Sequence, residues 1–245
     1  MDYKKCCDVV NVLNSYFSQS KDIASIEYPV SIKYKSIDYY IYMFYSCLLD
    51  YGMRSKTYHS NLINTYYKYR ELFTPSYVIK SNEEELKNII VNNIHPRYPN
   101  IALKKWIKLS NGLDKLDILN ILTNIRSYNE LEIFINSLNC YGQKTGGLLM
   151  RVICDSKICH FVECIKSIPI DRHDIEISYL TRVIDKRKLN DREIKMLSDL
   201  YVDVGYSLNI DPSLIDKYLW QVGNLYCNKK KCCDCPLNGI CFGGK

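Results

Sequence analysis

Apolar residues recur at intervals of three and four between residues 83 and 138, which is the spacing of amphipathic helices. The cap-type residue Asn82 and the acidic run 83–85 precede one such stripe, which stops at His95-Pro96. The pattern predicts further helices over 101–109, where Asn111-Gly112 ends the segment, over 113–125, and after Ser127, where S-Y-N-E is a capping-box pattern with Glu130.

The last third of the chain shows the same periodicity over 172–183, 191–201 and 213–225. No convincing alternation of the kind that marks hairpin strands occurs, although residues 26–41 are ambiguous between strand and helix. The sequence therefore predicts an all-α protein, arranged as two helical lobes without internal repeats.

Composition and charge indicate the cellular compartment and the kind of partner to expect. Hydrophobic residues make up 47% of the 245 residues, yet no apolar run reaches the length of a membrane span, and the N-terminus lacks a signal-peptide pattern. We therefore expect a cytoplasmic, intracellular protein with reduced thiols, no membrane partner and a monomeric state. The net charge of +6 is a mild signal for a polyanionic partner.

A glycine-containing hairpin is predicted within residues 138–151, where two helices meet around Cys140-Tyr141-Gly142. The second helix would open with Gln143, Lys144 and Thr145. Exposed amides at a helix N-terminus after a glycine form a ready phosphate site, so such a hairpin can grip a nucleic-acid backbone without reading its sequence. An ordinary helix–turn–helix corner would have the same pattern.

The chain ends with a dense group of cysteines. Four, two and five residues separate Cys227, Cys232, Cys235 and Cys241, so one short loop could wrap four thiolates around a metal. We expect a [4Fe–4S] cluster, with zinc as the alternative, and Cys233 could replace Cys232 as a ligand. Disulfides are a third reading, which the crowded spacing and the absence of a secretory segment disfavour.

The hairpin, a later aspartate and the cysteine loop occur in the order found in endonuclease III-like DNA glycosylases of the helix-hairpin-helix superfamily. The segment 138–145, LNCYGQKT, resembles that family's hairpin motif, keeping its leucine, second glycine and Lys-Thr pair but not its proline or first glycine. The resemblance implies that Lys144 is the nucleophile of a glycosylase with lyase activity, and that Gly142, Gln143 and Thr145 bind DNA.

Residues 168–173, IPIDRH, resemble the family's catalytic aspartate segment, which places that role on Asp171. The 27-residue step from Lys144 to Asp171 is longer than usual and is similar to that of the archaeal 8-oxoguanine glycosylases. Those enzymes also have an Asp-x3-Trp pair like Asp216 and Trp220, which implies a base-binding role for both residues. The four-residue step from Cys227 to Cys232 is shorter than the family's own.

The chemistry of these residues can be considered independently of the family resemblance. A neutral amine that attacks the sugar C1′ displaces the base and forms a Schiff base, and β-elimination then nicks the strand. A carboxylate such as Asp171 would stabilise the cationic sugar. The alternatives are a solvated first-turn lysine for Lys144, a helix N-cap for Asp171 and a core aromatic for Trp220.

We therefore predict a base-excision-repair DNA glycosylase and AP lyase that acts on an oxidised base in damaged double-stranded DNA. A monofunctional adenine-type glycosylase and a non-catalytic iron–sulfur DNA-binding protein are the alternatives. The predicted lobes are a helical barrel over 35–165, with the helix-hairpin-helix at 127–154, and a lobe of 1–34 plus 166–245 that carries the cluster loop at 227–241. The sequence does not choose between oxidised purines and oxidised pyrimidines.

Overall fold

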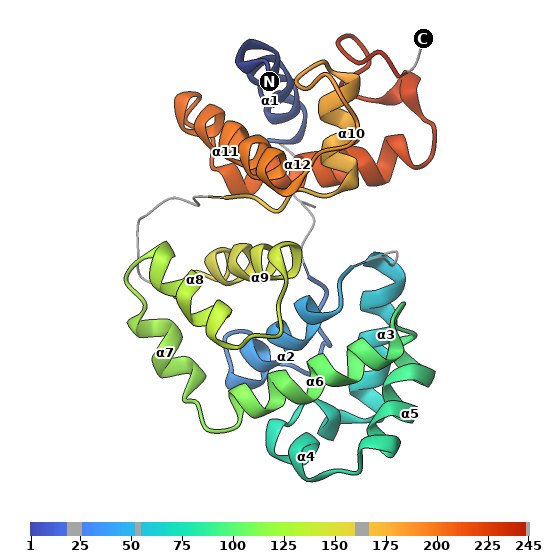
Figure 1. Cartoon of the computed structure of the whole chain (residues 1–245), viewed down its shortest axis with the longest axis vertical. Coiled ribbons are helices and arrows are strands. Elements are labelled where there is room, and N and C mark those ends of the chain that lie inside the picture. The colour runs from blue at the N-terminus through green and yellow to red at the C-terminus, as the bar shows by residue number, and fades with distance from the viewer. Residues whose placement is uncertain (19–25, 52–54, 160–166, 244–245) are drawn as a thin grey trace. The chain divides into compact units, whose positions relative to one another are not determined.

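A computed structural model describes residues 1–18, 26–51, 55–159 and 167–243, and every regular element within these ranges is a helix (Figure 1). The predicted all-α fold class is therefore confirmed for the described chain. Contacts between residues divide the chain into two units, Met1–Ala24 with Cys164–Lys245 (unit 1) and Ser25–Glu163 (unit 2). The sequence places these limits after residues 34 and 165 instead.

Unit 2 is built around one helix that is buried on nearly all sides. This helix, α2, has the sequence IDYYIYMFYSCL, and its residues from Tyr39 to Leu48 are buried apart from Ile41, as expected for a helix that is apolar all round. Helix α2 spans Ile37–Leu48. The other helices of unit 2 are α3 (Ser55–Lys68), η1 (Arg70–Phe73), α4 (Pro75–Lys80), α5 (Glu83–Ile94), α6 (Pro99–Leu113), α7 (Ile118–Asn124), α8 (Tyr128–Ser137) and α9 (Gln143–Asp155). Helices α6, α7 and α9 all contact α2.

Aromatic side chains fill the core of unit 2. Trp106 of α6 is fully buried and stacks on Tyr45 of α2, with ring centroids 4.5 Å apart. The Trp106 indole N–H donates to the Leu72 carbonyl at 3.0 Å, and the Tyr45 hydroxyl is 2.6 Å from the Ser110 hydroxyl. Because the polar tips of Trp106 and Tyr45 both have partners, these two rings contribute their apolar area without leaving an unsatisfied group.

Unit 1 combines the first helix of the chain with the last ones. Helix α1 (Tyr3–Phe17) packs against α11 (Asp191–Ser207) and α12 (Pro212–Val222), and α12 also contacts α10 (Arg172–Leu180). Phe17 stacks on Tyr218 at 5.4 Å, and the Asp2 amide donates to the Val183 carbonyl at 2.8 Å. The short helices η2 (Gly223–Cys227) and η3 (Cys232–Asp234) then lead through the cysteine loop.

Two predicted boundaries are wrong. Asn111-Gly112 does not end a helix but lies inside α6, which runs to Leu113. A Cβ on Gly112 would approach Leu138 Cδ2 to 3.0 Å, so this glycine permits close packing against the end of α8 rather than a turn. The helix expected over 113–125 is reduced to α7, which begins only after its N-cap Asp117.

The predicted N-caps are confirmed. Asn82 accepts from the amides of Glu84 and Glu85, and Ser127 accepts from the Glu130 amide. Glu130 reaches back to the amide of Arg126 rather than to Ser127 itself. The ambiguous segment 26–41 contains no strand where it is described, and its helical part begins at Ile37.

None of the helices in the described part of the chain is both long and apolar enough to cross a membrane.

Candidate active site

Helices α8 and α9 form the predicted hairpin and lie side by side in Figure 1. The turn between them takes its left-handed residue at Asn139, with φ of 52°, instead of at a glycine. Asparagine adopts this conformation more readily than other side chains do, so the turn closes without the family's first glycine. The hydroxyl of Tyr141 donates to the Phe44 carbonyl at 2.7 Å and anchors the turn on α2.

The N-terminus of α9 is open. Its N-cap Gly142 is exposed and makes no side-chain hydrogen bond to the first turn. The Gly142 amide donates to Thr145 Oγ1 at 3.0 Å, and Thr145 is buried. Thr145 thus helps to shape the helix end, while Gln143 and Lys144 project their exposed side chains from it. The positive end of the helix dipole favours an anion at this place.

Gly142 is not required by the protein's own packing. Its φ of −95° is accessible to any residue, and a Cβ built there would meet no atom within 4 Å. A glycine in open space at a helix N-terminus leaves room for a bound group to come close to the backbone. This is the geometry that a phosphate requires, because its oxygens accept hydrogen bonds from backbone amides.

Asp171 is the N-cap of α10. Its Oδ1 accepts from the amides of His173 at 2.6 Å and Asp174 at 3.3 Å, and Asp174 Oδ2 accepts from the Asp171 amide at 2.6 Å. The capping role considered from the sequence is therefore real. Asp171 lies in unit 1 and Lys144 in unit 2, and each is described within its own unit. Their catalytic pairing stays a prediction.

The aspartate helix is packed directly on the helix that enters the cysteine loop. A Cβ on Gly223 would come within 2.7 Å of His173 Cβ, so only glycine fits at this crossing. His173 Nε2 also lies 3.4 Å from Nδ2 of the Asn228 side chain. The helix changes to π-helical geometry over η2 directly after this contact. Unit 1 thereby links the position of Asp171 mechanically to the start of the cysteine loop.

Asp216 and Trp220 lie one turn apart on α12. The Asp216 side chain is buried and Trp220 is partly buried, so neither is a freely exposed surface group. The fully buried tryptophan of the chain is Trp106, not Trp220. The base-binding role that the resemblance implies for this pair stays a prediction.

Two thiols of the terminal loop have a raised pKa. Burial and, to a lesser degree, the nearby Cys235, Cys241 and Cys232 together raise the pKa of Cys227 to about 11. The pKa of Cys235 is also raised, first by burial and then by Cys241 and Cys232. Cys233 is exposed, whereas the other four cysteines of the loop are partly buried.

The loop closes around Leu237 and Gly243. Leu237 is buried and its carbonyl accepts from the Cys241 amide at 2.8 Å, while the Gly243 amide donates to Cys241 Sγ at 3.4 Å. These cysteines are free thiols. No three His, Cys, Asp or Glu side chains in the described ranges are close enough together to hold a metal ion. Four cysteines in one short loop are a donor set suited to zinc or an iron–sulfur cluster, and the metal centre expected from their spacing stays a prediction.

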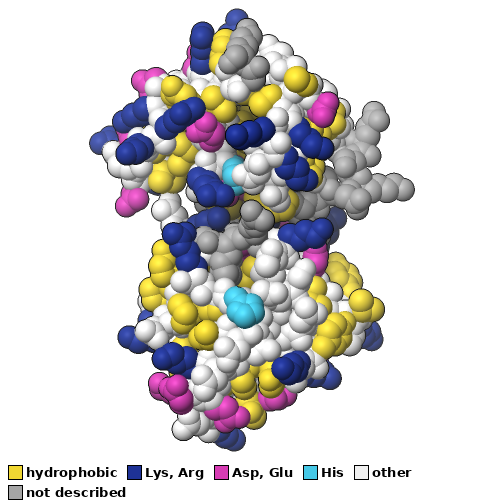
Figure 2. Space-filling model, turned by 90° about the vertical axis from the view of Figure 1, so that its right-hand side faces the viewer, with side chains coloured by type: hydrophobic (Ala, Val, Ile, Leu, Met, Phe, Trp, Pro, Cys, Tyr) yellow, Lys and Arg dark blue, Asp and Glu magenta, His cyan; other side chains and the backbone are white. Residues whose placement is uncertain are grey.

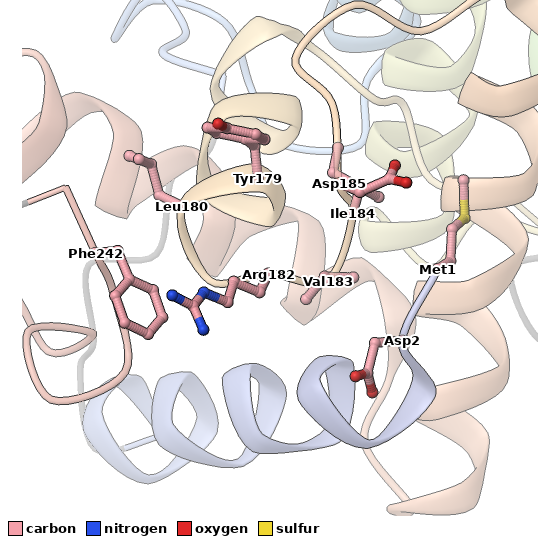
Figure 3. Close-up of a pocket in the computed structure, with 9 residues that line it drawn as sticks. All are labelled: Met1, Asp2, Tyr179, Leu180, Arg182, Val183, Ile184, Asp185 and Phe242. Carbon is pink, nitrogen blue, oxygen red and sulfur yellow. The ribbon is translucent and has the colours of Figure 1, made fainter.

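A pocket of about 630 Å³ lies elsewhere in unit 1 and contains none of the predicted site residues (Figure 3). Its side is closed by Arg182, whose guanidinium carbon lies 3.7 Å from the centre of the Phe242 ring. Asp2 and Asp185 also line it. Because one cationic side chain, Arg182, lies in the pocket together with two carboxylates, the charge of the pocket favours no single class of ligand.

Basic side chains are not confined to the hairpin: Figure 2 shows Lys and Arg spread over the viewed face of each unit. The sequence predicts a basic amphipathic helix through Lys104, Lys105 and Lys108, but not that this helix borders the hairpin. The contact is seen only in the structure, where a Cβ on Gly112 of α6 would approach Leu138 Cδ2, at the end of α8, to 3.0 Å. The pKa of Cys140 in the turn is raised to about 12, mainly by burial, while the charges of Lys105 and Lys108 oppose the rise.

Comparison with known proteins gives a fold but no closer relative. No protein-family model matches the chain, and no curated protein matches it. The 8-oxoguanine DNA glycosylase of Methanocaldococcus jannaschii aligns over 91% of this chain and 94% of its own, with a TM-score of 0.58 and 17% identity. That of Thermotoga maritima aligns over 90% and 97%, with a TM-score of 0.58 and 12% identity. The chain has the helical fold of these two glycosylases.

Proposed function

We propose that the chain is a DNA glycosylase of base excision repair that also cleaves abasic sites. The observation that carries this proposal is Lys144, an exposed amine in the first turn of the hairpin helix α9, within a fold shared with two glycosylases. The open helix end beside Gly142 would hold a backbone phosphate of damaged double-stranded DNA. The chain would act on this substrate as a monomer.

The reaction starts with the neutral Lys144 amine. Its lone pair attacks C1′ of the damaged nucleotide, the bond from C1′ to the base breaks, and the base leaves with that electron pair and takes up a proton. Loss of the amine proton and opening of the sugar ring give a protonated Schiff base. Removal of a C2′ proton then expels the 3′ phosphate by β-elimination, and water finally releases Lys144.

Asp171 is the proposed electrostatic partner of this reaction. Its carboxylate would stabilise the positive charge that develops on the sugar as the base departs. One carboxylate oxygen is committed to the α10 cap, so the side chain is held in a fixed orientation. This fixed orientation is an advantage, because a preorganised charge needs no rearrangement during the reaction.

The first substrate to test is 8-oxoguanine, because both structural neighbours carry that activity in their names. Asp216 and Trp220 are the proposed base contacts: an indole face for stacking and a carboxylate that accepts from purine N–H groups. Oxidised pyrimidines form the comparison panel, since the sequence does not choose between the two classes.

Borohydride trapping tests the lyase directly. Borohydride reduces the Schiff base to a stable amine, so wild-type protein should become cross-linked to a duplex with a single 8-oxoguanine or abasic site. Lys144→Gln should lose the cross-link, and Lys80→Gln, a change at another exposed lysine of unit 2, should keep it. Wild type that forms no adduct with any lesion refutes the lyase. Excision by Lys144→Gln without strand cleavage would favour a monofunctional glycosylase.

We also propose that Cys227, Cys232, Cys235 and Cys241 hold a [4Fe–4S] cluster, with zinc as the alternative. When bound, the cluster would cross-link the loop to the end of α12 and take no part in the chemistry at Lys144. Iron and acid-labile sulfide content, with a brown colour, distinguish it from zinc. Cys232→Ser should lose the iron and Cys233→Ser should retain it; the reverse result would make Cys233 the ligand.

A further inference from the structure

Four side chains of unit 2 contact one another in the order cation, tyrosine ring, tyrosine ring, cation. The Arg97 guanidinium carbon lies 5.3 Å from the centre of the Tyr98 ring, and Lys105 Nζ lies 4.8 Å from that of Tyr51. The two tyrosine rings are near parallel, at 19°, with centroids 6.3 Å apart. We call Arg97, Tyr98, Tyr51 and Lys105 the cation–tyrosine row.

The row is a surface feature and not part of the aromatic core. Tyr98 is 45% exposed and Arg97 is also exposed, whereas the core rings around Trp106 are fully buried. An exposed ring adds little to the stability of the unit, and an exposed cation–π contact adds little more. Tyr51 and Lys105 are partly buried, so the aromatic surface that the row leaves available is that of Tyr98, beside the Arg97 guanidinium.

The surroundings of the row are basic and continuous with the hairpin. Helix α6 has no acidic residue and adds the exposed Lys104 and Lys108 to the partly buried Lys105. Burial lowers the pKa of Lys105. Lys105 and Lys108 also act on the Cys140 thiol in the turn between α8 and α9. The charged side chains of α6 are therefore all positive, and the end of this helix packs against Leu138, at the start of the hairpin turn.

Aromatic rings next to cations are the elements that bind unpaired nucleotides. Every base has a π-face that can stack on a tyrosine, and neighbouring cations hold the phosphates on either side. A paired base in an intact duplex has no free face to offer. We propose that the cation–tyrosine row binds an unpaired nucleotide of single-stranded DNA, with the base stacked on Tyr98 and its flanking phosphates at Arg97 and Lys105.

Fluorescence anisotropy with a labelled oligothymidylate and an undamaged duplex tests this site. Tyr98→Leu should weaken single-strand binding about tenfold, the scale of one lost stacked base, and Tyr98→Trp should keep it within about twofold. Duplex binding should change by less than about twofold in either variant. The matched control is Tyr34→Leu, because Tyr34 is 61% exposed and has its own cation, Lys35 Nζ, at 5.5 Å.

Salt titration tests the phosphate contacts separately. Arg97→Gln should reduce the slope of log affinity against log salt for the single strand by about 0.7, the value for one phosphate, and Lys35→Gln should leave it unchanged. Wild type that does not bind the oligothymidylate overturns the proposal. So does a folded Tyr98→Leu that binds as wild type does, or a Tyr34→Leu that weakens binding equally.

These assays contain no damaged base and no turnover. If wild type gives neither base excision nor a trapped adduct with any lesion duplex, while single-strand binding still depends on Tyr98, the glycosylase is rejected and the row is kept. Trapping at Lys144 without any effect of Tyr98→Leu on single-strand binding would keep the glycosylase and reject the row.

Discussion

At the scale of single residues, Asp171 has two separable tasks, because its capping oxygen and its charge come from one side chain. Asp171→Asn keeps an acceptor for the His173 and Asp174 amides but removes the charge. We expect its free energy of unfolding to stay within about 0.5 kcal/mol of wild type, because asparagine caps helices as well as aspartate does. Its single-turnover excision rate should fall about a hundredfold.

Asp171→Ala provides the comparison, since it removes both properties and should also lose about 1 kcal/mol of stability. Thermal unfolding and single-turnover kinetics on the lesion duplex measure the two effects. An Asn variant with full turnover would show that Asp171 serves only as a cap.

Replacement of Gly142 should change the stability of the protein and its affinity for DNA in opposite directions. Serine at this position would cap α9, and because the space around the glycine is open it should fit and add a few tenths of a kcal/mol. The same hydroxyl would occupy the first-turn amides that a phosphate needs. Gly142→Ser should therefore melt at a slightly higher temperature and bind duplex DNA several-fold more weakly. Unchanged or tighter DNA binding would show that the phosphate lies elsewhere.

At the scale of elements, the crossing of α10 and η2 depends on Gly223. Gly223→Ala places a Cβ 2.7 Å from His173 Cβ, so backbone must move, and overpacking of this kind costs about 1–3 kcal/mol. Gly239→Ala, in the same C-terminal region but with open space around it, should cost little. Chemical denaturation of both variants measures the difference; equal stabilities would mean that the two helices are not tightly packed.

Sequence periodicity predicts helices well where caps and stripes are local. Asn82 and Ser127 could be identified because the partner amides lie only two or three residues away. Gly112 could not, since its reason is the Leu138 side chain, 26 residues later. Asn139 is a similar case: only the closed turn reveals that asparagine supplies the left-handed residue there.

At the scale of the whole molecule, the all-α class follows from the sequence, and the fold likeness agrees with the resemblance seen in LNCYGQKT and IPIDRH. The cation–tyrosine row could not be predicted from the sequence, because Tyr51 and Tyr98 are 47 residues apart and meet only through packing of α2 on α6. Local patterns predict elements, whereas surfaces shared by distant segments require the folded chain.

Loss of the proposed cluster should act on one unit. Because all four cysteines belong to unit 1, removing iron with a chelator should speed amide exchange in α10 and α12 while α2 and α6 stay protected. Hydrogen exchange read by mass spectrometry measures this. Equal protection of unit 1 with and without iron would mean that the loop does not depend on metal.

The position of unit 2 between the two segments of unit 1 also sets an order of assembly during synthesis. Unit 2 is one continuous stretch and can fold as soon as it leaves the ribosome, whereas α1 emerges before it and the packing partners of α1, α11 and α12, emerge after it. The apolar face of α1, with Val9, Val10 and Leu13, must wait meanwhile without a core. That face is thus exposed to aggregation and chaperone capture until α11 and α12 have been synthesised.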